Sequence, residues 1–256
     1  MQLDQIPASR VDGLIEGLAV LRTTQPSQRT LVAESRISIG VRVAGTASAL
    51  RGGDWQPLPR FTMTGVHCGS RVVRTEADGC LVLAHLHPAA AAALGLAARD
   101  LAGTTLDLAK LWPVQDLETL AARLSAAPDD AARMALLEAH IATRLAAGPV
   151  ADAMVVAAVN QIRAAPAEVR IAALAQQLGT SADTLERRFT AAVGVSPKRF
   201  ARAVRLRTAV LSYAADMTLT DVALGAGYYD QSHFVREMQS ATGLAPTLLL
   251  PARTFC

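Results

Sequence analysis

The sequence predicts an α+β protein with a β-rich, barrel-like N-terminal domain, a helical connector and an all-α C-terminal domain. Three observations carry this prediction: period-two alternation in the first third, a change to alanine-rich helix formers after residue 87, and a concentration of positive charge in the last hundred residues. We expect the domain boundaries at residues 1–112, 113–152 and 153–256.

The composition is that of an ordinary folded protein. Of the 256 residues, 51% are hydrophobic and 18% are charged, which excludes a disordered chain. Three cysteines are too few for a disulfide framework, and the first residues lack a basic stretch followed by an apolar one. Residues 79–98 are uncharged but contain two histidines and a proline, so they make a poor membrane span. We therefore expect a cytoplasmic protein.

The clearest strand is residues 36–43, where polar and apolar side chains alternate. This alternation predicts one buried face, made of Ile37, Ile39, Val41 and Val43. Further strands are expected at 60–66, 71–75 and 80–86, and turns at Gly52-Gly53-Asp54, Gly69-Ser70 and Asp78-Gly79. Helices are expected near 88–95, 114–125, 129–147 and 151–164.

Positive charge is concentrated near the C-terminus. Residues 154–256 contain 11 Lys and Arg against 7 Asp and Glu, a net of +4, which leaves the first 153 residues with a net of −1. Between residues 187 and 207 there are seven cations and no carboxylate. Such a block suits a polyanion, although an exposed cationic helix face is the alternative.

Residues 174–189 have the pattern of a helix, a tight turn and a second helix. Gly179 can take the left-handed backbone of the turn, and Ser181 can cap the second helix. Leu185 and Phe189 are four residues apart and would face the core. The outward residues are then Ala182, Asp183, Glu186, Arg187 and Thr190. They predict a recognition helix at about 182–191 that could enter a major groove of DNA.

The same arrangement recurs about fifty residues later. Thr218 and Asp221 can cap a first helix, Gly227 supplies the turn, and a second recognition helix is expected at about 230–240. Phe234 and Met238 would point inward. The outward residues are Gln231, Ser232, Val235, Arg236 and Gln239, of which Gln can pair with adenine and Arg with guanine.

A long helix is expected between the two units, from Pro197 to Ala214, with Ser196 as its cap. At ~1.5 Å per residue it would span about 27 Å, compatible with two recognition helices about 34 Å apart on one face of DNA. Its Arg199, Arg202 and Arg205 recur every third residue and are candidate phosphate contacts.

Residues from about 153 to 245 resemble the DNA-binding domain of AraC/XylS-type transcription regulators, which has two helix-turn-helix units joined by a long helix. The matching residues are Gly179, Ser181, Leu185, Arg187 and Phe189; Gly194-Val195-Ser196-Pro197; Arg205-Leu206, Ala209 and Leu211; Val222-Ala223; the run from Gly227 to Phe234, with Arg236; and Gly243-Leu244-Ala245-Pro246. The resemblance implies that Arg187 and Arg236 contact bases or phosphates. Asp183, Glu186, Gln231 and Ser232 would be their neighbours that tune specificity.

The sequence departs from the family pattern at three places. Asp183 and Glu186 put acids on the first recognition helix, Met238 replaces a usual Phe, and Leu248-Leu249-Leu250 replaces the usual Tyr-Arg ending. The acids predict either weaker DNA contact or a preference for cytosine amino groups. For the N-terminal domain the resemblance lies only in the order of elements, with short strands leading into a helical connector. It implies an effector-binding or dimerising domain.

Three further features lie in the first 150 residues. Gly79, His85 and His87 have the spacing of the first half of a cupin metal motif, with His67 and Cys68 as possible neighbours, but no Glu follows. Cys68 and Cys80 are either redox sensors or small core residues, and the core interpretation is favoured.

A stripe of apolar residues at helical spacing is either part of the core or a dimer interface, and the core interpretation is favoured. Its members are Met134, Leu137, Ile141 and Leu145.

The sequence therefore predicts a sequence-specific DNA-binding transcription regulator, without enzymatic activity, metal or cofactor. The candidate partners are double-stranded DNA, RNA polymerase, a small-molecule effector and a second copy of the chain, and no membrane partner is expected. The alternatives are a regulator that binds partner proteins and, less favoured, a metal-dependent β-barrel enzyme.

Overall fold

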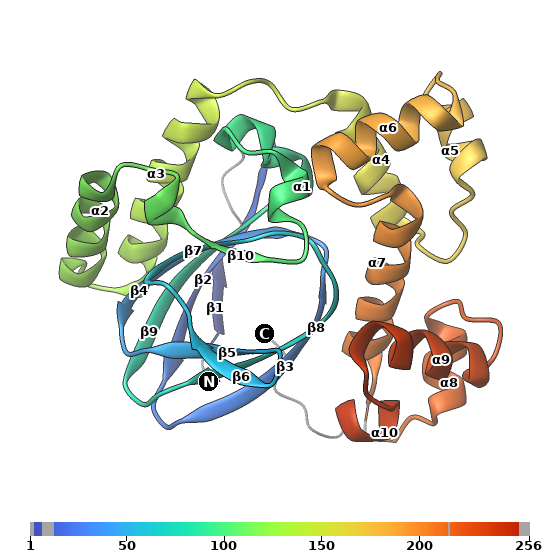
Figure 1. Ribbon diagram of the computed structural model, residues 1–256, viewed down its shortest axis with the longest axis horizontal. Helices are drawn as coiled ribbons and strands as arrows, with labels where there is room; N and C mark the ends of the chain where they lie inside the picture. Colours follow the sequence, from blue (N-terminus) through green and yellow to red (C-terminus); the bar gives the residue numbers. More distant parts are fainter. Residues whose placement is uncertain (1–2, 7–12, 215, 251–256) are drawn as a thin grey trace.

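A computed structural model describes residues 3–6, 13–214 and 216–250. It has a β-rich N-terminal part and a helical C-terminal part lying side by side (Figure 1). Within the described residues the strands form two antiparallel sheets. One has the order β1 (Leu3–Ile6), β2 (Ile15–Thr23), β9 (Gly79–Leu86), β4 (Ile37–Ala44), β7 (Phe61–Thr64) and β10 (Thr105–Asp107). The other has the order β3 (Ser27–Glu34), β8 (His67–Thr75), β5 (Ala47–Arg51) and β6 (Asp54–Pro57).

The larger sheet is covered on its outer face by two helices, α2 (Val114–Ala126) and α3 (Asp130–Ala147). On β4, Ile37, Ile39 and Val41 are buried in the core that α2 and α3 share with the sheet. Alternate residues on the opposite face, among them Ser38 and Arg42, line a cavity between the two sheets. Because successive side chains of a strand point to opposite faces, β4 contributes both to the core under α2 and α3 and to the lining of the cavity.

The expected strand at 36–43 is confirmed, but its polar face is buried as well. Ser38 and Arg42 are 7% and 8% exposed, because the second sheet covers them. The strands expected at 60–66, 71–75 and 80–86 are present as β7, β8 and β9, of which β8 begins four residues earlier than expected, at His67. The turns at Gly52-Gly53 and Asp78 are confirmed as well.

The turn expected at Gly69-Ser70 is wrong, since both residues lie inside β8. They are small because helix α9 (Gln231–Thr242) packs directly on this strand. A Cβ at position 69 would lie 2.6 Å from the Ala241 carbonyl oxygen, and the Ser70 hydroxyl donates to the Thr242 carbonyl oxygen at 3.1 Å. The Gly-Ser pair therefore allows close contact between the domains.

Short helical segments follow the β-rich part. The helix expected near 88–95 is two 3₁₀ turns, η1 (Pro88–Ala90) and η2 (Ala92–Leu94), which end at Gly95; α1 (Ala98–Leu101) and η3 (Leu108–Lys110) come next. The first turn is capped by His87, whose Nδ1 accepts from the Ala89 amide at 3.1 Å. The stripe of Met134, Leu137, Ile141 and Leu145 on α3 is buried against the sheet, which confirms the core interpretation.

The helical C-terminal part contains two units on one long helix (Figure 1). Its elements are α4 (Ala153–Ala164), α5 (Ile171–Gln177), α6 (Ala182–Val193), α7 (Pro197–Ser212), α8 (Leu219–Gly225), α9 and α10 (Pro246–Leu249). The first unit buries Leu185, Phe189 and Phe200 in one cluster, and the second buries Phe234 and Met238 in another. Because α7 contributes to both clusters, it fixes the two units to one another.

No helix in the described part of the chain is long and apolar enough to cross a membrane.

Candidate nucleic-acid interface

Helix α6 presents a polar face to solvent. Its start is fixed by Ser181, whose hydroxyl accepts from the Thr184 amide at 3.2 Å, and its end by Gly194 in the left-handed conformation. Leu185 and Phe189 are fully buried. The residues predicted to face outward, Ala182, Asp183, Glu186, Arg187 and Thr190, are all exposed. The predicted helix and its outward face are therefore confirmed, with Gly179 in the preceding turn at φ +66°.

Neighbouring arginines on α6 differ in what they contact. Arg188 forms two hydrogen bonds with the Asp152 carboxylate, at 2.7 and 2.8 Å, and Asp152 itself caps α4. Arg188 is therefore directed back into the domain. Arg187 is exposed and lines a surface hollow with Asp183 and Glu186. Arg187 is the cation on this helix that remains available to a ligand.

Helix α9 presents the corresponding face of the second unit. Asp230 caps it by accepting from the His233 amide at 2.6 Å, and Phe234 and Met238 are fully buried. Gln231, Ser232, Arg236 and Gln239 are exposed as predicted, and Val235 is half-buried. The Thr220 hydroxyl of α8 donates to the side-chain carbonyl oxygen of Gln231 at 2.9 Å.

The buried face of α9 carries a carboxylate that sequence reasoning missed. Glu237 is 7% exposed and accepts from Arg205 at 2.8 and 3.1 Å, from Arg202 at 3.3 Å and from the Tyr228 hydroxyl at 2.9 Å. Burial raises the pKa of Tyr228, and the adjacent Glu237 raises it further. The signal in the sequence was an acid between Phe234 and Met238 on the apolar stripe, because a buried carboxylate requires cationic or hydrogen-bonding partners.

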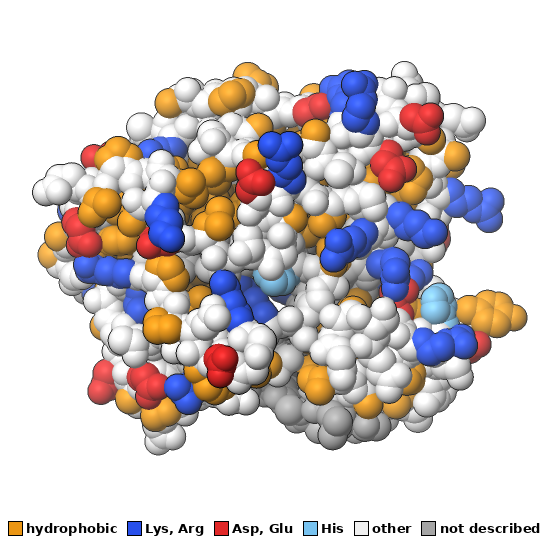
Figure 2. All heavy atoms as spheres, viewed as in Figure 1, with side chains coloured by type: hydrophobic (Ala, Val, Ile, Leu, Met, Phe, Trp, Pro, Cys, Tyr) orange, Lys and Arg blue, Asp and Glu red, His pale blue; other side chains and the backbone are white. Residues whose placement is uncertain are grey.

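The three predicted phosphate contacts on α7 therefore have different surroundings. Arg199 is exposed, the Arg202 side chain is 50% exposed, and the Arg205 side chain is 16% exposed and bound to Glu237. A groove of about 610 Å³ lies between the two units, lined in part by Lys198, Arg202, His233 and Arg236. Figure 2 shows Lys and Arg side chains gathered on this face of the helical part, between α6 and α9.

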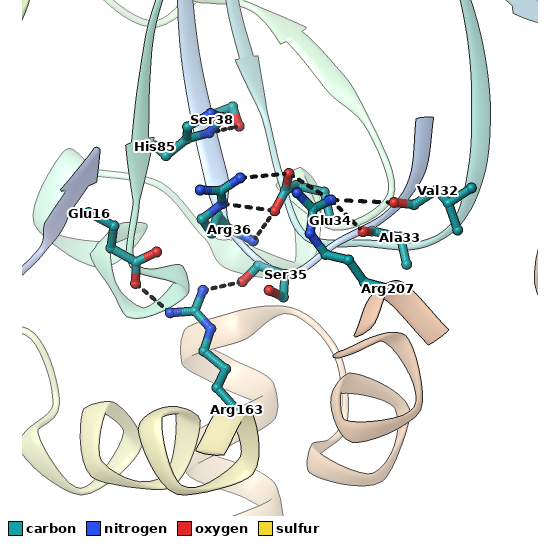
Figure 3. Close-up of polar contacts among 10 residues, drawn as sticks. All are labelled: Glu16, Val32, Ala33, Glu34, Ser35, Arg36, Ser38, His85, Arg163 and Arg207. Atoms are coloured by element: carbon teal, nitrogen blue, oxygen red, sulfur yellow. Dashed lines mark hydrogen bonds and ion pairs between the residues drawn. The ribbon is translucent and has the colours of Figure 1, made fainter. Parts of the chain in front are cut away.

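The N-terminal part contacts both recognition helices. Helix α1 packs against α6, and Ala97, Ala98 and Arg99 complete the hollow that Asp183, Glu186 and Arg187 line. Strand β8 packs against α9. Two arginines of the helical part reach the sheets (Figure 3). Arg163 of α4 forms an ion pair with Glu16 and donates to the Ser35 carbonyl oxygen at 2.7 Å.

The second of these arginines is Arg207 of α7, which contacts a bulge in β3 (Figure 3). It donates to the carbonyl oxygen of Ala33 at 3.0 Å and lies 3.2 Å from the Glu34 carboxylate. Arg36 holds the same carboxylate, with its Nε 3.0 Å away. Burial by itself would raise the pKa of Glu34, but the Arg36 and Arg207 charges outweigh it and hold this pKa below its usual range.

The cavity between the sheets has a volume of about 160 Å³ and a cationic lining. Arg42 is buried, and its Nε has no hydrogen-bond partner among the residues that the structure describes. Burial lowers the pKa of Arg42 and of Arg71, and Arg71 donates to the hydroxyls of Thr64 and Thr105, each at 3.2 Å. Arg29, Arg207 and the carboxylate of Glu34 also line the cavity, and the remaining lining is mostly aliphatic.

The histidines of the cupin-like spacing have separate surroundings. His85 lines the cavity, with its Nδ1 3.0 Å from the Ser38 hydroxyl, whereas His87 caps η1 beside Arg163. Burial lowers the pKa of His67, His85 and His87 to about 4. Within the described residues, no three His, Cys, Asp or Glu side chains gather as they would around a metal.

Burial raises the pKa of the Cys68 and Cys80 thiols, which suits inert core residues.

Residues 174–250 match a family model described as a helix-turn-helix domain, of the AraC type. Among solved structures, an apo variant of ToxT from Vibrio cholerae is similar over 93% of this chain and 97% of its own, with 11% identity and a TM-score of 0.53. A structure of ToxT from Vibrio cholerae O395 is similar over 93% of this chain and 96% of its own, with 12% identity and a TM-score of 0.50.

A probable AraC family transcriptional regulator from Rhodopseudomonas palustris is 29% identical over 40% of this chain and all of its own, with a TM-score of 0.36. A search of curated proteins gave no match. At these identities the ToxT structures show a shared two-domain fold, while the family model identifies the double helix-turn-helix part. Residues 174–250 therefore form a helix-turn-helix domain of the AraC type, which supports a role as a DNA-binding transcription regulator.

Proposed function

We propose that the protein recognises a specific duplex site by placing α6 and α9 in successive major grooves. The observation that carries this proposal is the pair of exposed polar faces on one long helix, α7. Its 16 residues span about 24 Å at ~1.5 Å per residue, so helices at its two ends can approach the ~34 Å separation of grooves on one face of DNA.

Each exposed residue has a role in this proposal. Arg187, Gln231 and Arg236 contact bases, while Ala182, Asp183, Glu186 and Ser232 shape the fit around them. Arg202 contacts a phosphate because it is exposed in the groove between the units, and Arg199 does so from the neighbouring hollow between α7, α9 and β8, where it is also exposed. Arg205 supports binding through Glu237, since its bonds to that carboxylate hold α9 against α7.

The test is capture of fragmented genomic DNA by the full-length protein, followed by affinity measurements on the enriched site. We expect Arg187→Ala and Arg236→Ala each to weaken specific binding at least about tenfold, because a good bidentate base contact is worth ~1–3 kcal/mol. Arg188→Ala is the matched control, since this neighbour on α6 binds Asp152. If both variants keep the wild-type preference for the site, the assigned recognition face is wrong.

We also propose that the cavity between the sheets binds a small anionic effector. Arg42 is buried there with no hydrogen-bond partner for its Nε among the described residues, Arg71 donates to hydroxyls, and the carboxylate of Glu34 in the same lining is paired with Arg36 and Arg207. A buried cation is stabilised by a counter-charge. The volume of about 160 Å³ suits an apolar body near the size of one benzene ring. Arg207 of α7 also lines the cavity, so a bound anion would contact the DNA-binding part directly.

Benzoate and its neutral analogue benzamide test this effector class. We expect benzoate at millimolar concentration to raise the unfolding temperature by a few degrees, as a ligand of the folded state does, with benzamide giving no shift. Arg42→Met should abolish the benzoate shift. Equal shifts with both compounds, or a shift that survives Arg42→Met, would refute an anion site at Arg42.

This proposal places the protein in the cytoplasm, where it meets DNA and RNA polymerase. A dimer would need another surface than the α3 stripe, which is occupied by the sheet.

A further inference from the structure

We infer that Thr220, which lies outside the recognition helix, sets the base preference of Gln231. This inference rests on the proposed function, because it assumes that Gln231 faces a base pair. It concerns the hydrogen bond from the Thr220 hydroxyl to the Gln231 side-chain carbonyl oxygen, 2.9 Å long, which joins α8 to the first residue of α9.

The two ends of this hydrogen bond are held by capped helix starts. Thr218 and Asp221 form a capping box around Thr220, with the Asp221 amide 3.1 Å from the Thr218 hydroxyl. Asp230 caps α9 immediately before Gln231. The packing of Val222 and Ala223 of α8 with Phe234 of α9 fixes the two helices in one cluster. The Thr220–Gln231 pair is therefore built on rigid backbone rather than on loops.

The hydrogen bond changes what Gln231 can offer to DNA. A free glutamine amide recognises adenine by accepting from N6 with its oxygen and donating to N7 with its nitrogen. With the oxygen engaged by Thr220, the amide nitrogen and its two N–H donors are left for the base. Two donors match the O6 and N7 acceptors of guanine. Gln231 in this protein therefore favours guanine over the adenine that its side chain alone would suggest.

Arg236 cannot supply the same preference from the same position. It lies five residues further along α9 and lines the groove between the two units, whereas Gln231 is at the helix start, where recognition helices meet base edges. The base pair read by Gln231 can thus be separated from that read by Arg236 in a set of single-base variants of the site.

The experiment measures the affinity of the full-length protein for its site with each of the four base pairs at every position. Four proteins are compared: wild type, Thr220→Val, Thr220→Ser and Gln231→Ala. Thr220→Val keeps the shape of the side chain and removes the hydroxyl, and Thr220→Ser keeps the hydroxyl. The base pair read by Gln231 is the one at which Gln231→Ala loses discrimination.

We expect wild type and Thr220→Ser to favour guanine at that position, and Thr220→Val to shift the adenine-to-guanine affinity ratio toward adenine by about tenfold. If Gln231→Ala loses discrimination but Thr220→Val keeps the wild-type ratio, Thr220 has no such role and DNA recognition by α9 still stands. If Gln231→Ala changes no position, the placement of Gln231 on a base is itself wrong. Because Thr220 is exposed, we expect its substitution to leave stability unchanged. Unfolding curves that overlay the wild-type curve would establish that the variants are folded.

Discussion

Two largely buried carboxylates, Glu237 and Glu34, join separate elements of this protein. Glu237 joins α7 to α9, and Glu34 joins Arg36 of the sheet to Arg207 of the helical part. Both carboxylates lie at contacts between elements distant in sequence. Because an unpaired buried charge is strongly unfavourable, such residues specify one arrangement of the elements they join.

Glu237→Ala should therefore lower stability sharply. The substitution leaves Arg205, with a side chain only 16% exposed, without its carboxylate, and it removes the acceptor of the Tyr228 hydroxyl. We expect a loss of about 3 kcal/mol in the free energy of unfolding, measured in urea. Glu237→Gln keeps a hydrogen-bond acceptor for the Tyr228 hydroxyl, so its free energy of unfolding should fall less than that of the alanine variant. A change below about 1 kcal/mol in the alanine variant would mean that Arg205 finds water or another partner at no cost.

His87 should make stability depend on pH. Burial, with Arg163 nearby, lowers its pKa to about 4 from 6.5, so the unfolded chain binds a proton more readily than the folded protein between these values. The stability contributed by neutral His87 is complete above pH 6.5 and is lost as pH falls toward 4. Protonation would also remove the Nδ1 acceptor of the Ala89 amide.

His87→Asn is the informative variant, because asparagine can still cap the 3₁₀ turn and does not titrate. We expect its free energy of unfolding to fall less than that of wild type between pH 7 and pH 5, by roughly 1 kcal/mol. Identical pH profiles for the two proteins would show that His87 is not the titrating group. His67 and His85 also have a pKa near 4 and contribute a background common to both proteins.

At the scale of elements, the turn before α9 places the second recognition helix. Gly227 has φ +76°, and a Cβ there would lie 2.1 Å from the Cβ of Ala167. Gly227→Ala should therefore cost about 2 kcal/mol or more, through backbone strain and this clash. Gly225 is the matched control two residues earlier. It lies in helix α8 with open space around it, so Gly225→Ala should be neutral or slightly stabilising. Thermal unfolding of both variants checks the pair, and equal losses would contradict the local argument.

The helical elements were predictable from local signals. Caps at Ser181, Ser196 and Thr218 and the turn glycines Gly179 and Gly227 are visible in the sequence, so α6, α7 and α9 fall close to the expected ranges. Strand β2 was missed because its inward residues, such as Ala19 and Leu21, line a largely aliphatic cavity and break the alternation of polar and apolar positions. The error at Gly69-Ser70 has a similar origin, since small residues at a contact between domains have the composition of a turn.

The outward recognition residues were likewise predictable, because helical periodicity alone turns them from the core. The hydrogen-bond partners of residues on these helices could not be predicted. The pairing of Arg188 with Asp152 and of Gln231 with Thr220 depends on how separate helices pack, which no local pattern specifies. The cavity escaped prediction for the same reason, since Arg42 and Arg71 come from different sheets.

At the scale of the whole molecule, contacts between the two parts fix where both recognition helices lie. Arg163 and Arg207 bind the sheets through Glu16, Ser35, Ala33 and Glu34. Apolar contacts add to them, with Val66 and Ala89 buried among the side chains of the first helical unit. Because Arg207 also lines the cavity, the side chain that holds α7 to the sheet would also meet the proposed anionic effector.

The double variant Arg163→Ala, Arg207→Ala should loosen this junction while leaving each part folded. The hydrogen bonds and ion pairs described for these side chains run across the junction, and Arg163 also lies over the Phe200 ring of the first helical unit. Neither arginine is a member of the buried apolar clusters, so we expect each core to survive its removal. A compact chain of this length has a radius of gyration of about 18 Å. We expect small-angle scattering to give a value several ångströms larger for the variant, with unchanged helical content by circular dichroism. An unchanged radius would mean that the apolar contacts and the Ser70–Thr242 hydrogen bond hold the parts together without these arginines, and that a ligand at Arg207 cannot release α7 from the sheets.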